Sequence, residues 1–382
     1  MAQMTEKHVS WVVCALVAIA VMSSLTLVDL RDLSPDIEAA ITGPSSESRI
    51  SPHHPDEVAH GRVAVVEQSG QPTTQHTWRW LWDVNSPDLQ SWQLFDRFTG
   101  AVMSKWGDLI VSDQRNSHVV RFTTDGELVE IIGREGAGPG EFGAPGSLAV
   151  ESEEDILWVA DGTLRRINRY KLWEKTSEFL DSFPIPFGSI IYPQVMTIND
   201  SHSYWASAVT IGCRIAHIKD TAEVIKAFGD FFSSKRFSGS MRNYNEGVVT
   251  LSPNGDVIFI GWHQPVIERW TITGELLATT EFPFPETEET QRFEKSMPSN
   301  QLTYYQVGIA WDDTHNQLFM RIRNDVIYSM IPESTEVVQR HIVNDLEWDR
   351  PGPFVVSNRG GNIRFFFFDG DGGVKATRPK EP

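Results

Sequence analysis

Six apolar runs recur along the chain, each opened by a turn-forming residue. The openings are spaced 47, 47, 54, 60 and 46 residues apart and are Asp108, Asp155, His202, Asp256, Asn316 and Asn362. A second apolar run follows several of them, and then a hairpin turn such as Asp125-Gly126. Repeats near 50 residues with three or four short strands are typical of propeller blades, which bury both faces against their neighbours. The sequence therefore predicts an all-β fold, a six-bladed β-propeller over residues 76–378.

A glycine-rich stretch separates the first two repeats. Between Ile132 and Asp161 it carries six glycines and two prolines, a composition that excludes a helix and predicts a linker between sheets. Its segment GREGAGPGEF, followed by a proline-containing loop and an apolar run ending in WVAD, resembles the NHL-type six-bladed β-propeller proteins of bacterial envelopes, within the TolB-like superfamily. The resemblance implies the propeller fold and an envelope location, but that group has no single activity.

Ring closure is expected to come from the N-terminal side of the repeats. Either Trp78 to Trp82 or Trp92 to Phe95 should pair with the last blade near Ile363 to Phe368, because an unpaired edge on that apolar run would promote aggregation. Trp78, Trp80 and Trp82 alternate along one face of a strand, and we expect that face to pack against a neighbouring sheet.

The fourth and fifth repeats are longer than the first by 7 and 13 residues. Glu286 to Met297 places acids early and Arg292 and Lys295 late, which predicts a short helix on an inter-blade crossing. Phe228 to Tyr244 is the other long connection. Long loops on a rigid scaffold are where binding residues usually lie.

The charge of the chain limits its possible partners, and its cysteine content limits its disulfide bonds. The net charge of −18 excludes a sequence-independent grip on nucleic acid, which requires a basic surface. The two cysteines, Cys14 and Cys213, cannot form a disulfide framework. We expect a monomer.

The N-terminus predicts attachment to a membrane. Trp11 to Val28 contains no charged residue, and no cleavage site follows it, so residues 1–30 are expected to be an uncleaved signal anchor, with a cleaved signal peptide as the alternative. Cys14 lacks the small preceding residue of a lipoprotein signal. Residues 31–75 are predicted to be a flexible linker and residues 379–382 a tail.

Several motifs do not justify a cofactor or metal. Gly138 to Gly143 matches G-x-G-x-x-G, but Pro145-Gly146 prevents the helix that a dinucleotide site needs. Asp369 to Gly373 lacks the further oxygens of a calcium loop and is expected to be a hairpin. The linker also contains three histidines, His53, His54 and His60, but a flexible segment gives them no fixed geometry for holding a metal. Asp113 and Asp161, at equivalent strand ends, are expected to cap the following turns.

A set of polar residues lies at or just past the positions equivalent to Asp113. In a propeller these strand ends surround one mouth of the central channel, so they are candidate ligand-binding residues: Arg115, Arg214, Trp262, His263, Arg321 and Arg323. Arg321 and Arg323 share one strand face, and a carboxylate or acidic sugar is the expected ligand. Asp312, Asp313 or Asp325 could instead pair with these two arginines inside the fold.

Two functions fit these features. The first is a membrane-tethered, non-catalytic envelope module that binds a protein, peptide or glycan. The second is a metal-dependent hydrolase or lyase, lactonase-like or amidating-lyase-like, as the resemblance allows. An enzyme of this kind needs histidines and carboxylates converging on the channel, and the aligned positions supply one histidine, His263. The sequence favours the binding module.

The anchor prediction is testable in cells. If the helix is an uncleaved anchor with the propeller outside the cytoplasm, protease added from outside the inner membrane should digest the C-terminal domain while that membrane is intact. Digestion only after inner-membrane lysis would show the opposite orientation.

Overall fold

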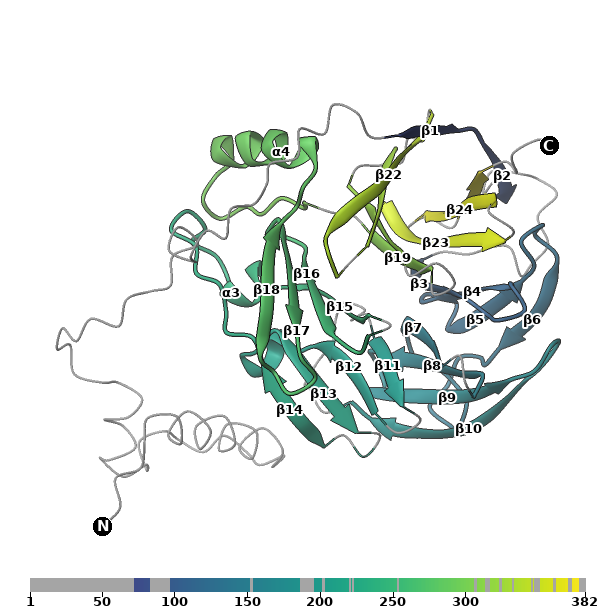
Figure 1. Cartoon of the computed structure of the whole chain (residues 1–382). Coiled ribbons are helices and arrows are strands. Elements are labelled where there is room, and N and C mark those ends of the chain that lie inside the picture. Colours follow the sequence, from purple (N-terminus) through teal and green to yellow (C-terminus); the bar gives the residue numbers. More distant parts are fainter. Residues whose placement is uncertain are drawn as a thin grey trace, which may run out of the picture. The chain divides into compact units, whose positions relative to one another are not determined.

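A computed structural model of the chain describes residues 72–82, 97–151, 154–185, 196–200, 203–219, 221, 223–252, 254–305, 308–312, 317–322, 325–331, 333–344, 346, 351–359, 362–369 and 373–377. These residues form six sheets, here called blades 1 to 6 in chain order (Figure 1). The predicted signal anchor, Cys14 and the three linker histidines lie outside the described residues. Among the residues described, no helix is long and apolar enough to cross a membrane.

The first three blades are four-stranded antiparallel sheets in simple up-and-down order. Blade 1 consists of β3 (Phe98–Met103), β4 (Leu109–Asp113), β5 (His118–Phe122) and β6 (Leu128–Ile132). Blade 2 consists of β7 (Pro145–Glu151), β8 (Ile156–Asp161), β9 (Arg166–Leu172) and β10 (Ser177–Pro184). Blade 3 consists of β11 (Met196–Asp200), β12 (Ser203–Ser207), β13 (Ile215–Lys219) and β14 (Val224–Phe228), with a 3-10 turn at Val209–Ile211.

The last three blades follow the same order, with additions. Blade 4 consists of β15 (Gly247–Leu251), β16 (Val257–Gly261), β17 (Val266–Trp270) and β18 (Leu276–Glu281). Blade 5 consists of β19 (Gly308–Asp312), β20 (Gln317–Arg321), β21 (Val326–Ile331) and β22 (Glu336–Val343). Blade 6 consists of β23 (Pro351–Arg359), β24 (Asn362–Asp369) and β25 (Val374–Thr377). The predicted repeat is confirmed, because the six openings lead into the second strand of each blade.

The N-terminal segment completes blades 5 and 6. Strand β2 (Trp78–Trp82) pairs antiparallel with β25, so the chain before blade 1 supplies the fourth strand of blade 6. The predicted closure by Trp78 to Trp82 is confirmed for the blade, although its partner is β25 and not β24. Strand β1 (Thr73–His76) adds to blade 5 in parallel with β22, so Thr73 to Gln75 belong to the propeller and not to the predicted linker. The alternative segment, Trp92 to Phe95, lies outside the described residues.

The aromatic residues of β2 pack around a buried lysine. Lys375 is 4% exposed, and its Nζ lies 4.3 Å from the ring centroid of Trp78 and 4.5 Å from that of Trp80. Burial of an ammonium group is costly unless electron-rich groups surround it, and ring faces supply part of that stabilisation. Trp78 also packs against the apolar cluster between blades 5 and 6, as the sequence predicted, whereas Trp80 is 38% exposed.

The core is divided among the blade interfaces. Six apolar clusters each join two neighbouring blades: one connects β3 to β5 of blade 1 with β24 and β25 of blade 6, and another connects blades 5 and 6 around Phe365 and Phe367. Strands of this kind, buried on both faces, read as continuous apolar runs and do not alternate. The close packing of neighbouring blades also requires small residues. A Cβ on Gly100 of β3 would lie only 2.4 Å from the Gly146 carbonyl oxygen of β7.

The long connections gather on one face, which we call the mouth face. It is the face where the first strand of each blade begins and the second strand ends, so the connections to the next blade and the turns after β4, β8, β16 and β20 lie there. The described parts of these connections contain two helices, α3 (Met241–Tyr244) before blade 4 and α4 (Pro285–Ser296) between blades 4 and 5. The predicted inter-blade helix is confirmed by α4 (Figure 1).

The glycine-rich stretch is an ordered connection between β6 and β7. The Glu141 carboxylate accepts hydrogen bonds from the Gly138 amide (2.8 Å) and from Arg134 Nε (3.0 Å). Phe142 is fully buried between blades 1 and 2, and Gly133, at a φ of 73°, leaves room for it. The stretch therefore acts as a packed spacer, which confirms the predicted linker.

Asp161, the last residue of β8, holds this spacer to its own blade. Its fully buried carboxylate accepts four backbone hydrogen bonds, from Gly143 (2.7 Å), Ala144 (3.1 Å), Thr163 (3.0 Å) and Leu164 (2.9 Å). Asp113, at the equivalent end of β4, likewise accepts the Asn116 amide at 3.2 Å. Both residues cap the following turn, as predicted.

Replacing Asp161 with Ala should lower the free energy of unfolding by about 3 kcal/mol, because four buried amides lose a charged acceptor. Urea unfolding of the full chain measures this loss. The matched control is Asp125→Ala in an exposed hairpin turn, where we expect a change below about 0.5 kcal/mol. Equal changes in the two variants would show that the Asp161 bonds do not stabilise the fold.

Candidate binding site

The structure describes five of the six predicted site residues, and all five lie at the mouth face. Arg115, Trp262 and His263 follow second strands, Arg214 precedes β13, and Arg321 ends β20. Arg323 lies outside the described residues. The five residues differ in what surrounds them.

Arg214 joins blades 3 and 4 from inside. It is 3% exposed; its Nη1 lies 2.6 Å from Glu268 Oε2 of β17, and its Nε donates to the Asp230 carbonyl at 2.8 Å. The guanidinium also lies 3.8 Å from the ring centroid of Phe232. A buried guanidinium with a carboxylate partner has its charge balanced within the fold.

Arg321 and Arg115 lie in opposite environments. Arg321 is fully buried, with its guanidinium carbon 5.1 Å from the ring centroid of Phe367 in blade 6. Arg115 is exposed in the turn after β4. The predicted arginines thus do not meet as one exposed group in the part of the chain described.

Trp262 and His263 meet an aromatic residue that the sequence did not single out. The His263 and Tyr304 ring centroids are 4.5 Å apart, and those of Trp262 and Tyr304 are 6.5 Å apart. Tyr304 is 56% exposed and Trp262 is partly exposed. We call these three residues the aromatic cluster, and it presents ring surface to solvent on the mouth face between blades 4 and 5.

His263 has a defined proton position. The imidazole is 5% exposed, and its Nδ1 lies 2.7 Å from the Thr303 carbonyl oxygen, which can only accept a hydrogen bond. Burial lowers the pKa of His263 from its ordinary value, so the ring is neutral at pH 7. The proton is therefore assigned to Nδ1, and Nε2 keeps a lone pair.

Glu246 stands opposite Trp262. Gly247 of β15 pairs with Gly261 of β16, and the Trp262 amide donates to the Glu246 carbonyl at 3.0 Å. The side chains of Glu246 and Trp262 therefore extend from the same face of the sheet at this end. Burial raises the pKa of the Glu246 carboxyl to about 7. Among the described residues, no hydrogen bond or ion pair reaches that carboxyl.

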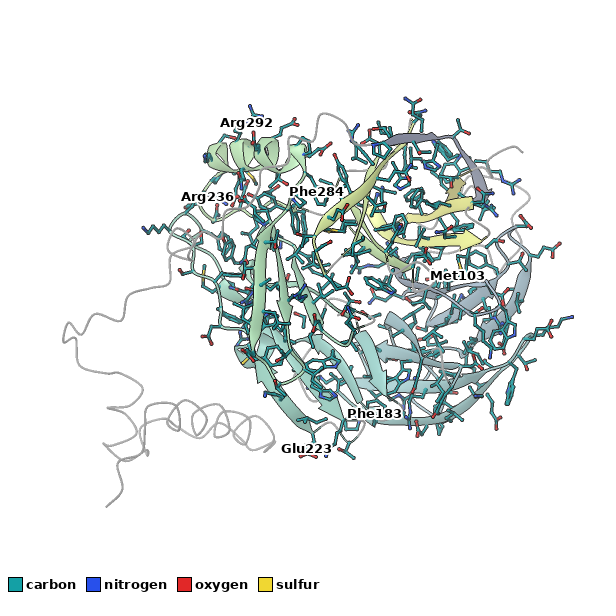
Figure 2. The ribbon with its side chains drawn as sticks, in the orientation of Figure 1. Met103, Phe183, Glu223, Arg236, Phe284 and Arg292 are labelled. Atoms are coloured by element: carbon teal, nitrogen blue, oxygen red, sulfur yellow. The ribbon has the colours of Figure 1, made fainter. Side chains whose placement is uncertain are left out.

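The surrounding loops are held by specific polar contacts. Arg236 Nη2 lies 2.8 Å from Glu294 Oε1 of α4 and also donates to the Gln301 carbonyl; Figure 2 shows Arg236 beneath α4. The Tyr305 hydroxyl donates to Glu294, and the Tyr305 amide donates to the Trp262 carbonyl at 2.8 Å. These contacts fix the segment that carries Tyr304 against the end of β16.

A rigid frame therefore presents two ring surfaces, a neutral imidazole and a partly buried carboxyl group. Within the ranges described, no three His, Cys, Asp or Glu side chains come together as a metal site. The arrangement is suited to holding a ligand group by stacking and by charge.

Sequence reasoning found Trp262 and His263 but missed Glu246 and Tyr304. Glu246 is a single acid before a strand, and nothing in its neighbours distinguishes it. Tyr304 lies in the Thr303-Tyr304-Tyr305 segment between α4 and β19, where a pair of aromatic residues in a polar loop was the available signal.

Comparisons with known proteins agree with the fold. A family model described as a 6-bladed beta-propeller matches residues 100–212. No curated protein matches the chain. Many solved structures do.

Three of these structures, all distant from this chain in sequence, are compared with it by identity, TM-score and coverage. A streptogramin B lyase structure is 14% identical, with a TM-score of 0.48 over 76% of this chain and 85% of that chain. Virginiamycin B lyase from Staphylococcus aureus is 16% identical, with a TM-score of 0.45 over 76% and 80%. A structure described as an exported protein from Bacteroides fragilis NCTC 9343 is 12% identical, with a TM-score of 0.49 over 81% and 100%. Likenesses this distant carry no argument about activity or location.

The raised pKa of Glu246 predicts how stability depends on pH. The folded carboxyl holds its proton up to about pH 7, whereas the unfolded one loses it near 4.5, so the free energy of unfolding falls as pH rises between these values. Glu246→Gln removes this dependence. Relative to the parent, the variant should gain roughly 1–2 kcal/mol between pH 5 and pH 8, a figure discounted for partial exposure.

Urea unfolding of both proteins at pH 5, 6, 7 and 8 measures the gain, and Glu178→Gln on the exposed β10 is the control. A difference between parent and Glu246→Gln that stays constant from pH 5 to pH 8 would contradict the assigned burial of the Glu246 carboxyl.

Proposed function

We propose that this protein is a membrane-tethered binding module of the bacterial envelope, whose mouth face holds a protein, peptide or glycan through the aromatic cluster. The observation that carries the proposal is the exposed ring surface of Trp262 and Tyr304 beside the partly buried Glu246. Aromatic side chains supply large contact areas with little conformational freedom to lose, and they are enriched in binding sites for this reason.

The roles of the other polar residues also favour binding. Asp113 and Asp161 cap turns, and Arg214 balances Glu268, so these charged groups at the mouth face already serve the fold. The aromatic cluster and Glu246 are the groups that we assign to ligand contact between blades 4 and 5. Arg115, exposed in blade 1, can contribute a peripheral contact to a large ligand.

The envelope location rests on the sequence. The uncharged run from Trp11 to Val28 would tether the chain, and the resemblance to envelope propellers supports the same placement. Such a tether would keep the propeller near the membrane.

An array of peptides and envelope glycans, probed with the full chain in detergent, tests the proposal. We expect a subset of probes to bind the parent, and Trp262→Ala to weaken that binding about tenfold or more, because a central aromatic contact is lost. The matched control is Trp173→Ala. Trp173 is 51% exposed in the turn between β9 and β10, on the face opposite the mouth face, and its loss should leave binding unchanged.

Two results would count against the proposal. The first is that no probe binds, or that both tryptophan variants bind like the parent. The second is stoichiometric calcium or zinc in the purified chain, which would favour the metal-dependent hydrolase or lyase.

A further inference from the structure

One acidic group beside the aromatic cluster, Glu246, lacks a cationic partner among the described residues. Arg236 is paired with Glu294, and Arg214 with Glu268, so these two arginines are committed inside the fold. Lys235 and Arg242, in the loop leading into blade 4, are exposed. His263 is neutral at pH 7 and adds no positive charge. The whole chain carries a net charge of −18.

We propose that this site takes a lysine or arginine side chain of a basic peptide segment, with Glu246 and the rings of Trp262 and Tyr304 as its contacts. The inference rests on the proposed function and makes it more specific. It also reverses the charge of the ligand that the arginine-rich sequence pattern predicted.

A cation is the group that satisfies all of these contacts at once. A carboxylate next to ring faces attracts an ammonium or guanidinium group through both its charge and the ring quadrupoles. Burial raises the pKa of Glu246 because its ionised form is poorly solvated, and a bound cation would offset that cost. The same contact type exists within this fold, where Lys375 lies between Trp78 and Trp80.

A neutral sugar fits the observations less well. It can stack on Trp262 and Tyr304 and accept a hydrogen bond from the protonated Glu246 carboxyl, but it does not balance the charge of that carboxyl once it ionises above about pH 7. An acidic sugar would place a second negative charge beside it, which is unfavourable. The peptide is therefore the ligand class that the carboxyl group favours.

Fluorescence anisotropy with fluorescein-labelled octalysine tests this inference on the full chain in detergent. The fully N-acetylated peptide, which keeps the length but lacks the charges, is the neutral probe. Salt at about 150 mM screens the long-range attraction of any polycation to an acidic protein. Octa-arginine is measured in parallel, because a guanidinium group can also stack on the rings.

Glu246→Gln should weaken octalysine binding about tenfold, because the ionic contact lies in the site itself. The control Glu178→Gln removes the same charge from β10, where the side chain is exposed and outside the mouth face, and should change binding less than about twofold. Trp262→Ala should also weaken binding, and the acetylated peptide should bind none of the proteins measurably.

Equal effects of Glu246→Gln and Glu178→Gln, or no octalysine binding, would overturn the inference. The proposed function would survive that outcome if an array probe, such as a glycan, lost binding in Trp262→Ala but kept it in Glu246→Gln. Failure of both the array and the peptide measurement would remove the proposed function as well.

Discussion

The pairing of β2 with β25 is the constraint on which the rest of the structure depends. Each blade buries both faces against its neighbours, so the core exists as six interfaces arranged in sequence, and the last of them joins blades 6 and 1. Strand β2 ties the chain before blade 1 into blade 6 and covers the outer edge of β25. Without it, the apolar strand Asn362–Asp369 would belong to a three-stranded sheet with an open edge, which promotes aggregation.

Polar residues reinforce this ring between the blades. Arg121 of β5 is fully buried, pairs with Asp108 at 2.6 Å, and donates to carbonyl groups of the turn after β9 in the next blade. Arg269 of β17 repeats the arrangement with Asp256 and reaches the Glu333 carbonyl in blade 5. Because so many charged groups are used in this way, a charged residue in the sequence is poor evidence for a ligand site in this fold.

This explains what the sequence could and could not predict. Local signals located the six second strands, the helix α4 and the capping role of Asp161, because turn residues and apolar runs act within a few positions. The burial of Arg214 depends on its pairing with Glu268, 54 residues away, and the burial of Arg321 depends on the packing of blade 6 against blade 5. Glu246 carried no local pattern at all. Its environment is set by the end of β16, which only the folded structure brings beside it.

The central claim is that the mouth face between blades 4 and 5 is where a ligand binds. Hydrogen–deuterium exchange of the full chain, with and without octalysine, tests it most directly because it locates binding without any substitution. The account predicts slower exchange in residues 243–247, 261–265 and 300–305, with no change in the turn at residues 173–176. Protection confined to the outer strands of the blades, or to the glycine-rich connection at residues 133–144, would contradict it.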